Sequence, residues 1–247
     1  MAKSEVNCKV ALVTGASKRI GNGIARKFHE EGYNIVLHYN MSSKDALFLA
    51  EELNKKRENS CFPIQFDLGN FHEYENFKDQ LGDDWKKINV LINNASTFYP
   101  TPIDDISEDH WEKLIGSNLK GPMFLIKGLK QKLIESNGSI INITDTNLSK
   151  GVANYSIYSA AKAGLEAITK GLARELAPEI KVNAIAPGAM LEPPDVTWTE
   201  EQKNKVIDTI PLKRMGSEKD IAETVKFLAD SEYITGQIIK VDGGRSL

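Results

Sequence analysis

The sequence predicts an α/β fold: a single doubly wound, Rossmann-type parallel sheet of about seven strands with helices on both faces. Short runs of β-branched and aliphatic residues recur along the 247-residue chain, amphipathic stretches separate them, and we find no repeat or linker that divides it. Repeated alternation of strand and helix is typical of a parallel sheet, and right-handed crossovers place helices on both of its faces. We therefore expect one domain over residues 1–247, with a ligand crevice at the carboxyl ends of the strands.

Each expected strand is a short apolar run without strict alternation, as in strands that are covered on both faces. In chain order these runs are Val10–Val13, Asn34–His38, Phe62–Phe66, Val90–Ile92, Ser139–Ile143, Lys181–Ile185 and Gln237–Val241. The expected helices are the amphipathic segments Asn22–Glu31, Lys44–Arg57, Phe71–Lys86, Asn118–Ser136, Tyr155–Ala177 and Glu218–Ala229.

Composition excludes several classes of protein. With 41% hydrophobic and 26% charged residues the chain can bury a core, whereas a net charge of −3 argues against binding nucleic acid by phosphate neutralisation. Two cysteines, Cys8 and Cys61, cannot form a disulfide scaffold or a Cys-rich zinc site, so no metal is expected. We find no apolar run near the roughly 18 residues of a membrane span and no secretory signal. These observations predict a cytoplasmic protein with neither a nucleic-acid nor a membrane partner.

A glycine-containing turn follows the first strand and reads Thr14-Gly15-Ala16-Ser17-Lys18-Arg19-Ile20-Gly21-Asn22-Gly23. Glycine at 15 and 21 allows a tight turn and a close approach of the backbone. The free N–H groups and the positive dipole end of the following helix suit a pyrophosphate. The same pattern also fits a strand–helix connection that merely needs glycine, but its place after the first strand of a βαβ unit favours dinucleotide binding.

The end of the second strand indicates which nicotinamide cofactor binds. An NAD enzyme usually has Asp or Glu there to hold the ribose hydroxyls, and a carboxylate would repel the 2′-phosphate of NADPH. Here Lys18 and Arg19 add positive charge across the turn, and no carboxylate precedes Asp45 in the stretch His38-Tyr39-Asn40-Met41-Ser42-Ser43-Lys44. This pattern predicts NADPH; the alternative is that His38 and Ser42 only end a strand.

Tyr158 and Lys162 are four residues apart in a predicted helix, which places a phenol and an ammonium on the same face. A phenol has a pKa of about 10. A neighbouring ammonium favours the phenolate and brings that pKa toward the working range, so the pair is a candidate for acid–base catalysis. Taken alone, the spacing also fits a Tyr and a Lys on a solvated helix face; the glycine turn and the sheet favour catalysis.

Together these motifs resemble the short-chain dehydrogenase/reductase family. The matching pieces follow the family order over almost the whole chain: Thr14-Gly15…Gly21, Asn93-Asn94-Ala95-Ser96, Asn118, Tyr158…Lys162 and Pro187-Gly188. The resemblance implies that Tyr158 donates a proton, that Lys162 holds the nicotinamide ribose and tunes Tyr158, and that Asn118 anchors a proton-relay water. The expected cofactor-binding residues are Gly15, Ser17, Lys18, Arg19, Ile20, Gly21, His38, Tyr39, Asn40, Ser42, Asp67, Leu68, Asn94, Ala95, Ser96, Thr144, Tyr158, Lys162, Pro187 and Gly188.

Two departures from the family pattern resemble its pteridine reductase branch. Arg19 stands where the turn normally has its middle glycine, and Asp145, 13 residues before Tyr158, stands where Ser is usual. The resemblance adds Asp145 to the catalytic residues, and a flat pterin suits stacking on Phe98 and hydrogen bonds from Arg19. The alternatives are that Arg19 is a surface cation, that Asp145 is a turn residue at the end of a strand, and that Phe98 is a loop aromatic packed on the core. The expected substrate-binding residues, three of them in a substrate loop around 187–210, are Arg19, Ser96, Phe98, Asp145, Tyr158, Met190, Leu191 and Pro194.

The predicted function is NADPH-dependent reduction of a dihydropterin, of the dihydrobiopterin or dihydromonapterin type, or of dihydrofolate, with antifolates as inhibitors. One alternative is a ketone reductase, such as a 3-oxoacyl-thioester reductase, against which Asp145 argues because Ser normally polarises the carbonyl. Another is a cofactor-binding regulator without catalysis. The resemblance also implies a homotetramer, while the roles of Trp198 and Arg245 stay open.

Overall fold

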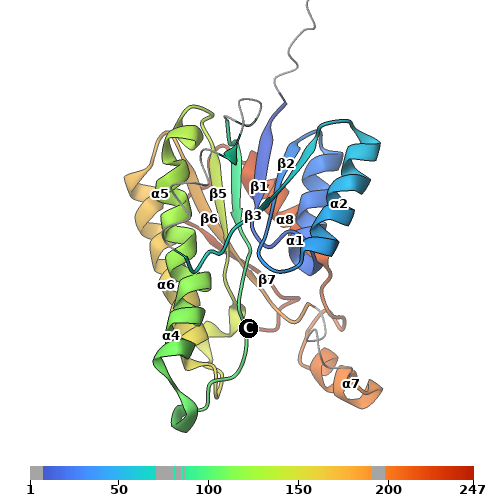
Figure 1. Cartoon of the computed structure of the whole chain (residues 1–247). Helices are drawn as coiled ribbons and strands as arrows, with labels where there is room; N and C mark the ends of the chain where they lie inside the picture. The colour runs from blue at the N-terminus through green and yellow to red at the C-terminus, as the bar shows by residue number, and fades with distance from the viewer. Residues whose placement is uncertain (1–7, 71–79, 82–84, 86, 191–197) are drawn as a thin grey trace, which may run out of the picture.

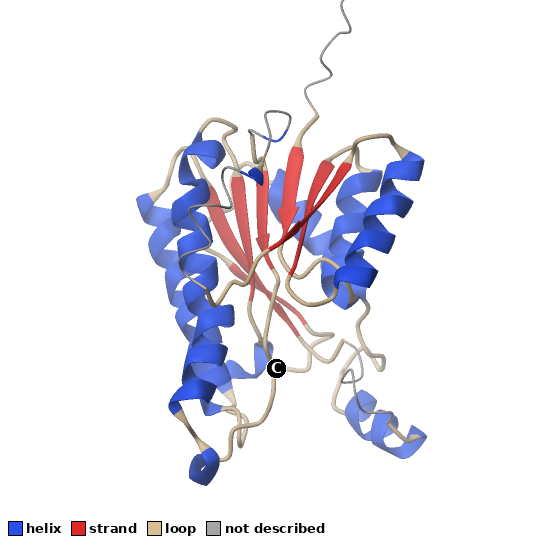
Figure 2. Cartoon of the chain, in the orientation of Figure 1, coloured by secondary structure: helices blue, strands red, loops and turns tan. Residues whose placement is uncertain are grey.

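The computed structural model describes residues 8–70, 80, 81, 85, 87–190 and 198–247. Within them, seven strands form one sheet in the order β3-β2-β1-β4-β5-β6-β7, and every pair of neighbours is parallel. Helices cover both faces of this sheet (Figures 1 and 2), so the predicted doubly wound α/β fold is confirmed. The strand order reverses between β1 and β4, and sheets of this kind bind ligands outside the carboxyl ends of the strands at that point.

The elements lie close to their predicted positions. The strands are β1 Val10–Val13, β2 Asn34–Tyr39, β3 Cys61–Gln65, β4 Val90–Asn93, β5 Ser139–Ile143, β6 Lys181–Pro187 and β7 Ile238–Val241. The helices are α1 Arg19–Glu30, α2 Ser43–Lys56, α4 Glu108–Ile115, α5 Gly121–Ile134, α6 Ser156–Glu175, α7 Glu200–Asp208 and α8 Glu218–Asp230. The strands agree best because burial on both faces leaves uninterrupted apolar runs in the sequence.

The helix predicted over Asn118–Ser136 is α5, which begins at Gly121, and a further helix that was not predicted, α4, begins before it at Glu108. Its first turn is capped by the hydroxyl of Ser107, which accepts a hydrogen bond from the His110 N–H at 3.2 Å. Between α4 and α5 lies a π-helical turn, Gly116–Lys120, which changes the spacing of the apolar residues. The prediction missed α4 for this reason. The predicted helix Phe71–Lys86 lies mostly outside the described residues.

Two apolar layers hold the helices against the sheet. Successive side chains of a strand point to opposite faces. Val13 and Ile92 therefore join the layer that contains α1, α2 and α8, whereas Leu12 and Leu91 join the layer that contains α5 and α6. Because both faces of the central strands are apolar, the polar side chains that carry chemistry gather where those strands end.

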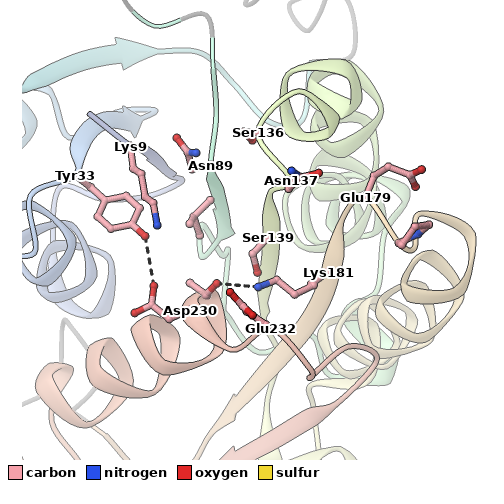
Figure 3. A pocket seen from close by; sticks show the side chains of 13 residues that line it. Lys9, Tyr33, Asn89, Ser136, Asn137, Ser139, Glu179, Lys181, Asp230 and Glu232 are labelled. Atoms are coloured by element: carbon pink, nitrogen blue, oxygen red, sulfur yellow. Dashed lines mark hydrogen bonds between the residues drawn. The ribbon is translucent and has the colours of Figure 1, made fainter. Parts of the chain in front are cut away.

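The opposite edge of the sheet, where the strands begin, has a crevice of about 360 Å³ (Figure 3). The ammonium of Lys181 donates there to the carbonyl oxygens of Ala229 at 3.2 Å and Ser231 at 2.7 Å, at the C-terminal end of α8. A cation at this end of a helix satisfies free carbonyls and opposes the negative end of the dipole. The Tyr33 hydroxyl donates to Asp230 at 3.5 Å. These polar groups join α8 to the sheet.

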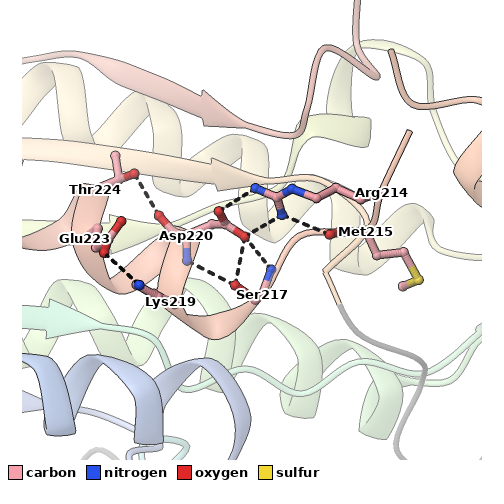
Figure 4. A network of polar contacts seen from close by, with 7 residues as sticks. All are labelled: Arg214, Met215, Ser217, Lys219, Asp220, Glu223 and Thr224. Atoms are coloured by element: carbon pink, nitrogen blue, oxygen red, sulfur yellow. Dashed lines mark hydrogen bonds and ion pairs between the residues drawn. The ribbon is translucent and has the colours of Figure 1, made fainter. Parts of the chain in front are cut away.

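A network of polar contacts around Asp220 fixes the start of α8 (Figure 4). The carboxylate accepts a hydrogen bond from the Ser217 N–H at 2.7 Å, and the Ser217 hydroxyl accepts one from the Asp220 N–H at 3.4 Å. This reciprocal arrangement is a capping box. Arg214 donates to both carboxylate oxygens, at 2.9 and 2.8 Å, and is the main cause that holds the pKa of Asp220 well below its usual range.

Replacing Asp220 with Asn is expected to lower the free energy of unfolding by about 1 kcal/mol at pH 7, because the amide lacks the negative charge that pairs with Arg214 and faces the positive end of α8. A carboxyl group with a depressed folded pKa stabilises above its unfolded pKa of about 4, and this contribution is lost as the pH falls toward the folded value. The difference between the two proteins should therefore shrink in urea unfolding at pH 3. The matched control is Glu223→Gln, since the ion pair of Glu223 with Lys219, at 3.8 Å, is exposed and therefore weak. An equal loss of unfolding free energy in both variants would contradict the stabilising role of the Asp220 carboxylate.

Candidate functional site

The turn between β1 and α1 requires glycine at two positions. Gly15 has a φ of +62°, and a Cβ there would lie 2.9 Å from the Cα of Ala95. A Cβ on Gly21 would lie 2.2 Å from the carbonyl oxygen of Gly15. Among the described residues, no side chain caps the start of α1 and its first turn has no acidic residue. The first N–H groups of α1 therefore remain available to an anion.

Thr14 and Asn94 hold this turn against β4. The Thr14 hydroxyl accepts hydrogen bonds from the N–H groups of Asn94 at 2.9 Å and Ala95 at 3.0 Å. The Asn94 amide donates to the carbonyl oxygens of Thr14 at 2.8 Å and Gly15 at 3.2 Å. The Asn94 side chain, predicted to lie along the cofactor, thus positions the glycine turn.

His38 holds the other side of the same turn. Its Nδ1 accepts a hydrogen bond from the Gly15 N–H at 3.2 Å, and its Nε2 lies 2.9 Å from the carbonyl oxygen of Phe66. Since Nδ1 must accept and Nε2 must donate, the ring is the neutral Nε2–H tautomer. Burial lowers the pKa of His38 to about 4 and keeps the ring neutral at physiological pH. His38, which was predicted to contact the cofactor, therefore also links the ends of β1, β2 and β3.

A cavity of about 1060 Å³ opens above this turn at the carboxyl end of the sheet. Many of the predicted cofactor residues line it: Gly15, Ser17, Lys18, Arg19, Ile20, Gly21, His38, Tyr39, Asn40, Ser42, Asp67, Leu68, Asn94, Ala95 and Ser96. Phe98, predicted on the substrate side, lines it as well. One wall of the cavity was not predicted and comes in part from α4; it is formed by Met41, Gly69, Asn70, Thr97, Glu112, Lys113 and Ser117.

Two cations stand at the edge of the cavity. Lys18 lies 3.0 Å from the carboxylate of Asp45, in the first turn of α2. Arg19 is exposed and has a φ of +52°, a left-handed conformation that suits the glycine it replaces. A strained residue that faces a cavity is a candidate for a function that its side chain performs.

Tyr158, Lys162 and Asp145 come together where β5 ends and α6 begins. The Tyr158 hydroxyl donates to Oδ2 of Asp145 at 3.1 Å. The Lys162 Nζ lies 5.8 Å from the centroid of the Tyr158 ring and donates to the carbonyl oxygen of Ile143 at 2.8 Å. The phenol is 8% exposed and the lysine 2% exposed, so both groups lie in a region of low dielectric.

The pKa values in this cluster differ from the sequence-based expectation. Burial raises the pKa of Tyr158, Asp145 adds to the rise, and only the Ser96 hydroxyl opposes it. The expected lowering by Lys162 is wrong for this geometry, because the ammonium is directed to Ile143 and the nearest charge is a carboxylate. Burial lowers the pKa of Lys162 to about 8, against the opposing effect of Asp145. At neutral pH the phenol is therefore a neutral proton donor beside a mostly charged lysine.

Asp145 also fixes the backbone that follows β5. Its Oδ1 accepts hydrogen bonds from the N–H of Asn147 at 2.7 Å and from the side-chain amide of Asn147 at 2.9 Å. These bonds begin the short helical turn Thr146–Ser149. Asp145 is therefore a turn residue, as the alternative interpretation held, and its second oxygen, Oδ2, remains free to accept from Tyr158. Asn147 was missed, although an Asp side chain often accepts a hydrogen bond from the backbone N–H two residues on.

Asn118 lies in the π-helical turn and is fully buried. Its amide donates to the carbonyl oxygens of Thr97 at 2.8 Å and Leu114 at 2.9 Å. Its Oδ1 accepts the hydroxyl of Ser96 at 2.7 Å. The side chain thus ties the loop after β4 to the helix, and single-turn π bulges are frequent at functional sites.

Phe98 extends the cluster toward the cavity. Its ring stacks on Tyr155, with centroids 4.6 Å apart and planes 16° apart, and meets Tyr158 edge-on at 4.8 Å. Phe98 nevertheless remains 54% exposed. One face of this ring is therefore covered by Tyr155 while the side chain still presents a large apolar surface. Tyr155 was missed; a second tyrosine about one helical turn before Tyr158 was the available signal.

The remaining predicted residues lie beside the end of β6. The Thr144 hydroxyl donates to the carbonyl oxygen of Ile185 at 3.2 Å, and Pro187 accepts a hydrogen bond from the Thr146 hydroxyl at 3.1 Å. A Cβ on Gly188 would lie 2.5 Å from the Cβ of Asp242. Met190 is 7% exposed. Leu191 and Pro194 lie outside the described residues, Trp198 is half-buried, and Arg245 donates to the Thr209 hydroxyl at 3.1 Å.

The described part of the chain contains no group of His, Cys, Asp and Glu side chains arranged to hold a metal ion. None of the helices in this described part is both long and apolar enough to cross a membrane.

The fold and the site define an oxidoreductase that uses a nicotinamide dinucleotide. A family model described as enoyl-(acyl carrier protein) reductase, a model of short-chain dehydrogenases, matches residues 15–246. The chain belongs to the short-chain dehydrogenase/reductase family, whose reductases use NAD(P)H.

Curated relatives of two kinds are similar to the chain. Pteridine reductase 1 of Leishmania tarentolae is 37% identical over 284 residues, covering 96% of each protein. The 3-oxoacyl-[acyl-carrier-protein] reductase FabG of Staphylococcus epidermidis is 39% identical over 240 residues, covering 96% of this chain and 98% of the relative. That of Staphylococcus aureus is 38% identical, with 96% and 97% covered. The family is thus shown, and the two kinds of relative are about equally similar.

Proposed function

We propose that the protein is an NADPH-dependent pteridine reductase that converts dihydropterins, of the dihydrobiopterin or dihydromonapterin type, and dihydrofolate to their tetrahydro forms. The observation that carries the proposal is the 3.1 Å hydrogen bond from Tyr158 to Asp145. Reduction of a ring C=N bond places hydride on carbon and a proton on the adjacent nitrogen. A buried neutral phenol beside a carboxylate suits that proton transfer.

The residues of the large cavity fit NADPH. The uncapped first turn of α1 suits the pyrophosphate, and a Cβ at Gly21 would fill the space that the turn keeps open. Lys18 and Ser42, which line the cavity at the end of β2, suit the 2′-phosphate. Thr144, Pro187 and Gly188 are proposed to lie around the nicotinamide.

Bound NADPH supplies the hydride, and the chain supplies the proton. Tyr158 donates its phenolic proton to the ring nitrogen, and Asp145 hydrogen-bonds the phenol and supports the exchange of that proton. Lys162 uses one N–H on Ile143, which leaves two donors for the hydroxyls of the nicotinamide ribose. Asn118, which holds Ser96, is proposed to anchor the water that returns a proton to Tyr158.

Activity should fall as the pH rises through about 8. Lys162 has its pKa lowered to about 8 by burial, so its ammonium is present below that pH and lost above it. The measurement is kcat against pH at saturating substrate and cofactor. A Lys162→Arg variant keeps its charge to far higher pH, so its residual activity should not decline over the same range. A flat profile in the natural protein would contradict the requirement for the ammonium.

The pterin is proposed to stack on the uncovered surface of Phe98. Support comes from the Tyr155 ring, which holds Phe98 from one side at 4.6 Å while the side chain remains 54% exposed. Arg19 supplies donors for a pterin carbonyl, and Ser96 lies beside Tyr158. Met190, Leu191 and Pro194 of the loop around 187–210 complete the proposed substrate side.

Replacing Arg19 with Gly should stabilise the protein and weaken the enzyme. Glycine relieves the strain of the left-handed backbone at φ +52°. It also makes the unfolded chain more flexible, which offsets part of this effect, so the free energy of unfolding should rise by up to about 1 kcal/mol. Loss of the guanidinium should raise the KM for dihydropterin about tenfold. Urea unfolding and steady-state kinetics measure the two effects. Unchanged KM together with higher stability would leave Arg19 without a substrate contact.

The proposal is tested by supplying NADPH or NADH with dihydrobiopterin, dihydromonapterin, dihydrofolate or an acetoacetyl thioester and following cofactor absorbance. We expect NADPH oxidation with the pterins, inhibited by methotrexate. Oxidation with the thioester alone would support the second candidate, a 3-oxoacyl-thioester reductase. That candidate is favoured by the lengths of the alignments. The alignment with the Staphylococcus epidermidis relative spans 240 residues, almost the length of this chain. The alignment with the Leishmania enzyme spans 284 residues and so includes additional residues of that relative. Cofactor binding without any turnover would instead support a regulator.

The chain is further proposed to act as one domain over residues 1–247 and, by similarity to its family, as a cytoplasmic homotetramer. Light scattering of the purified protein measures its mass in solution and tests the assembly.

A further inference from the structure

A chain of hydrogen bonds runs from α2 through α1 to the glycine turn. The carboxylate of Glu52, on α2, accepts from the guanidinium of Arg26, on α1, through Nη1 and, at 2.7 Å, through Nη2. The Arg26 Nε donates to Oδ1 of Asn22 at 2.7 Å, one helical turn earlier. The Asn22 Nδ2 donates in its turn to the carbonyl oxygen of Ser17 at 3.3 Å. Of these four residues, only Ser17 lines the large cavity.

Each bond of this chain can form in only one direction. An ionised carboxylate only accepts hydrogen bonds, a guanidinium only donates them, and a side-chain amide does both. Because Arg26 occupies Oδ1 of Asn22, the amide presents its N–H groups to the carbonyl oxygen of Ser17. Glu52 fixes the plane of the guanidinium with a bidentate pair, and this hydrogen bonding is the main cause that raises the pKa of Arg26. The orientation of the Asn22 amide is thus set from α2.

We propose that Asn22 and Arg26 are positioning residues for the dinucleotide, although neither lines its cavity. The inference rests on the proposed function, which places the cofactor in that cavity. The Ser17 carbonyl and the Lys18 N–H belong to one planar trans peptide unit and point in opposite directions. Asn22 therefore holds this N–H on the side away from itself, next to the first turn of α1. The N–H groups there are the ones proposed to bind the pyrophosphate.

The backbone of the turn needs to be held from both sides. Arg19, in the middle of the turn, has a left-handed φ of +52°, and such a conformation persists only when its surroundings fix it. Thr14 and Asn94 hold the start of the turn. Asn22 and Arg26 hold its end. If the second tether is lost the turn relaxes, and a dinucleotide must order it again at a cost in affinity.

Two substitutions break the chain of bonds at different places. Asn22→Ala removes the donor to Ser17 and should weaken the binding of NADPH and of NADH about fivefold, the scale of one hydrogen bond. Alanine favours helix, so α1 should persist. Glu52→Gln releases the guanidinium from α2 and should weaken both nucleotides about twofold, since the amide keeps one acceptor. The double variant should bind no more weakly than Asn22→Ala, because Glu52 acts only through Asn22.

The experiment is a titration of the full chain with NADPH and with NADH, followed by nicotinamide fluorescence without any substrate. Urea unfolding of each variant establishes that it is folded under the conditions of the titration. The matched control is Glu31→Gln, which makes the same charge change as Glu52→Gln at an exposed carboxylate of the α1 C-cap, paired with Lys27 at 2.8 Å. This control should leave both dissociation constants unchanged.

Losses of affinity that are equal for the two nucleotides and not additive between Asn22 and Glu52 support the proposal, because the turn binds the pyrophosphate that both nucleotides share. Unchanged affinity in Asn22→Ala, with or without lower stability, overturns it and leaves the chain of bonds as a link between helices. Additive losses, or a loss for one nucleotide alone, also overturn it.

The same titration separates this inference from the proposed function. If the natural protein binds NADH and not NADPH, the proposed NADPH enzyme fails while the positioning role is judged with NADH. If it binds neither nucleotide, both fall. The choice of substrate is judged by the separate panel, because no substrate enters this titration.

Discussion

Replacement of Tyr158 by Phe is expected to lower kcat with NADPH and dihydropterin by about a hundredfold or more, the scale of lost general acid catalysis. The substitution removes one oxygen and keeps the ring that meets Phe98 edge-on at 4.8 Å. That hydroxyl donates to Asp145 at 3.1 Å and lies beside the Ser96 hydroxyl, and its loss leaves the ring contacts in place, so the cluster should keep its packing. The KM for NADPH should change little because the ring and Lys162 remain in place.

The matched control is Tyr33→Phe. It removes a hydroxyl of the same kind, hydrogen-bonded to Asp230 at 3.5 Å at the opposite edge of the sheet. This control should retain full activity. Activity of Tyr158→Phe near that of the natural protein would exclude the phenol as the acid.

Replacement of Asp145 by Asn is expected to lower kcat with dihydropterin by about ten- to a hundredfold. An amide oxygen still accepts from Asn147, so the turn after β5 should persist. The amide has no proton to exchange with Tyr158 at neutral pH, and the phenol loses the carboxylate that helps to raise its pKa. The readout is kcat with dihydropterin and with an acetoacetyl thioester, together with the pH profile of each.

A second variant, Asp145→Ser, introduces the side chain that the family usually has here. Serine hydrogen-bonds a carbonyl but does not exchange protons near neutral pH. We expect the ratio of kcat/KM for the thioester to that for the pterin to rise in this variant relative to Asp145→Asn. If both variants keep the natural activity with dihydropterin, the carboxylate has only its role in the turn.

The sheet was predictable because each strand carries its own signal. β3 shows both the strength and the limit of that signal. Its apolar run was recognised, although the interior of Cys61–Gln65 contains Pro63. The structure explains the proline, since β3 is at the edge of the sheet and a missing N–H is tolerated there. Edge position depends on the order of all seven strands, which a single run does not contain.

The site was predictable where chemistry restricts the residue type and unpredictable where only packing does. Tyr158 and Lys162 match the family pattern, and Asp145 could be singled out because it departs from that pattern. The buried neutral state of His38 and the carbonyl contacts of Asn94 depend on how separate strands meet. The π-helical turn that holds Asn118 likewise interrupts the periodicity on which helix prediction depends.

The two carboxylate oxygens of Asp145 have different roles, and this limits how the residue can change in evolution. One is bound to Asn147 and the other faces Tyr158, at 2.7 and 3.1 Å. On the proposed function, an exchange of this side chain for serine would change both the proton chemistry and the contact with Asn147 in one mutational step. Conversion between pterin and ketone chemistry in such proteins should therefore require a compensating substitution at residue 147. Libraries that randomise 145 and 147 together should yield more folded, altered-specificity clones than libraries that vary 145 alone.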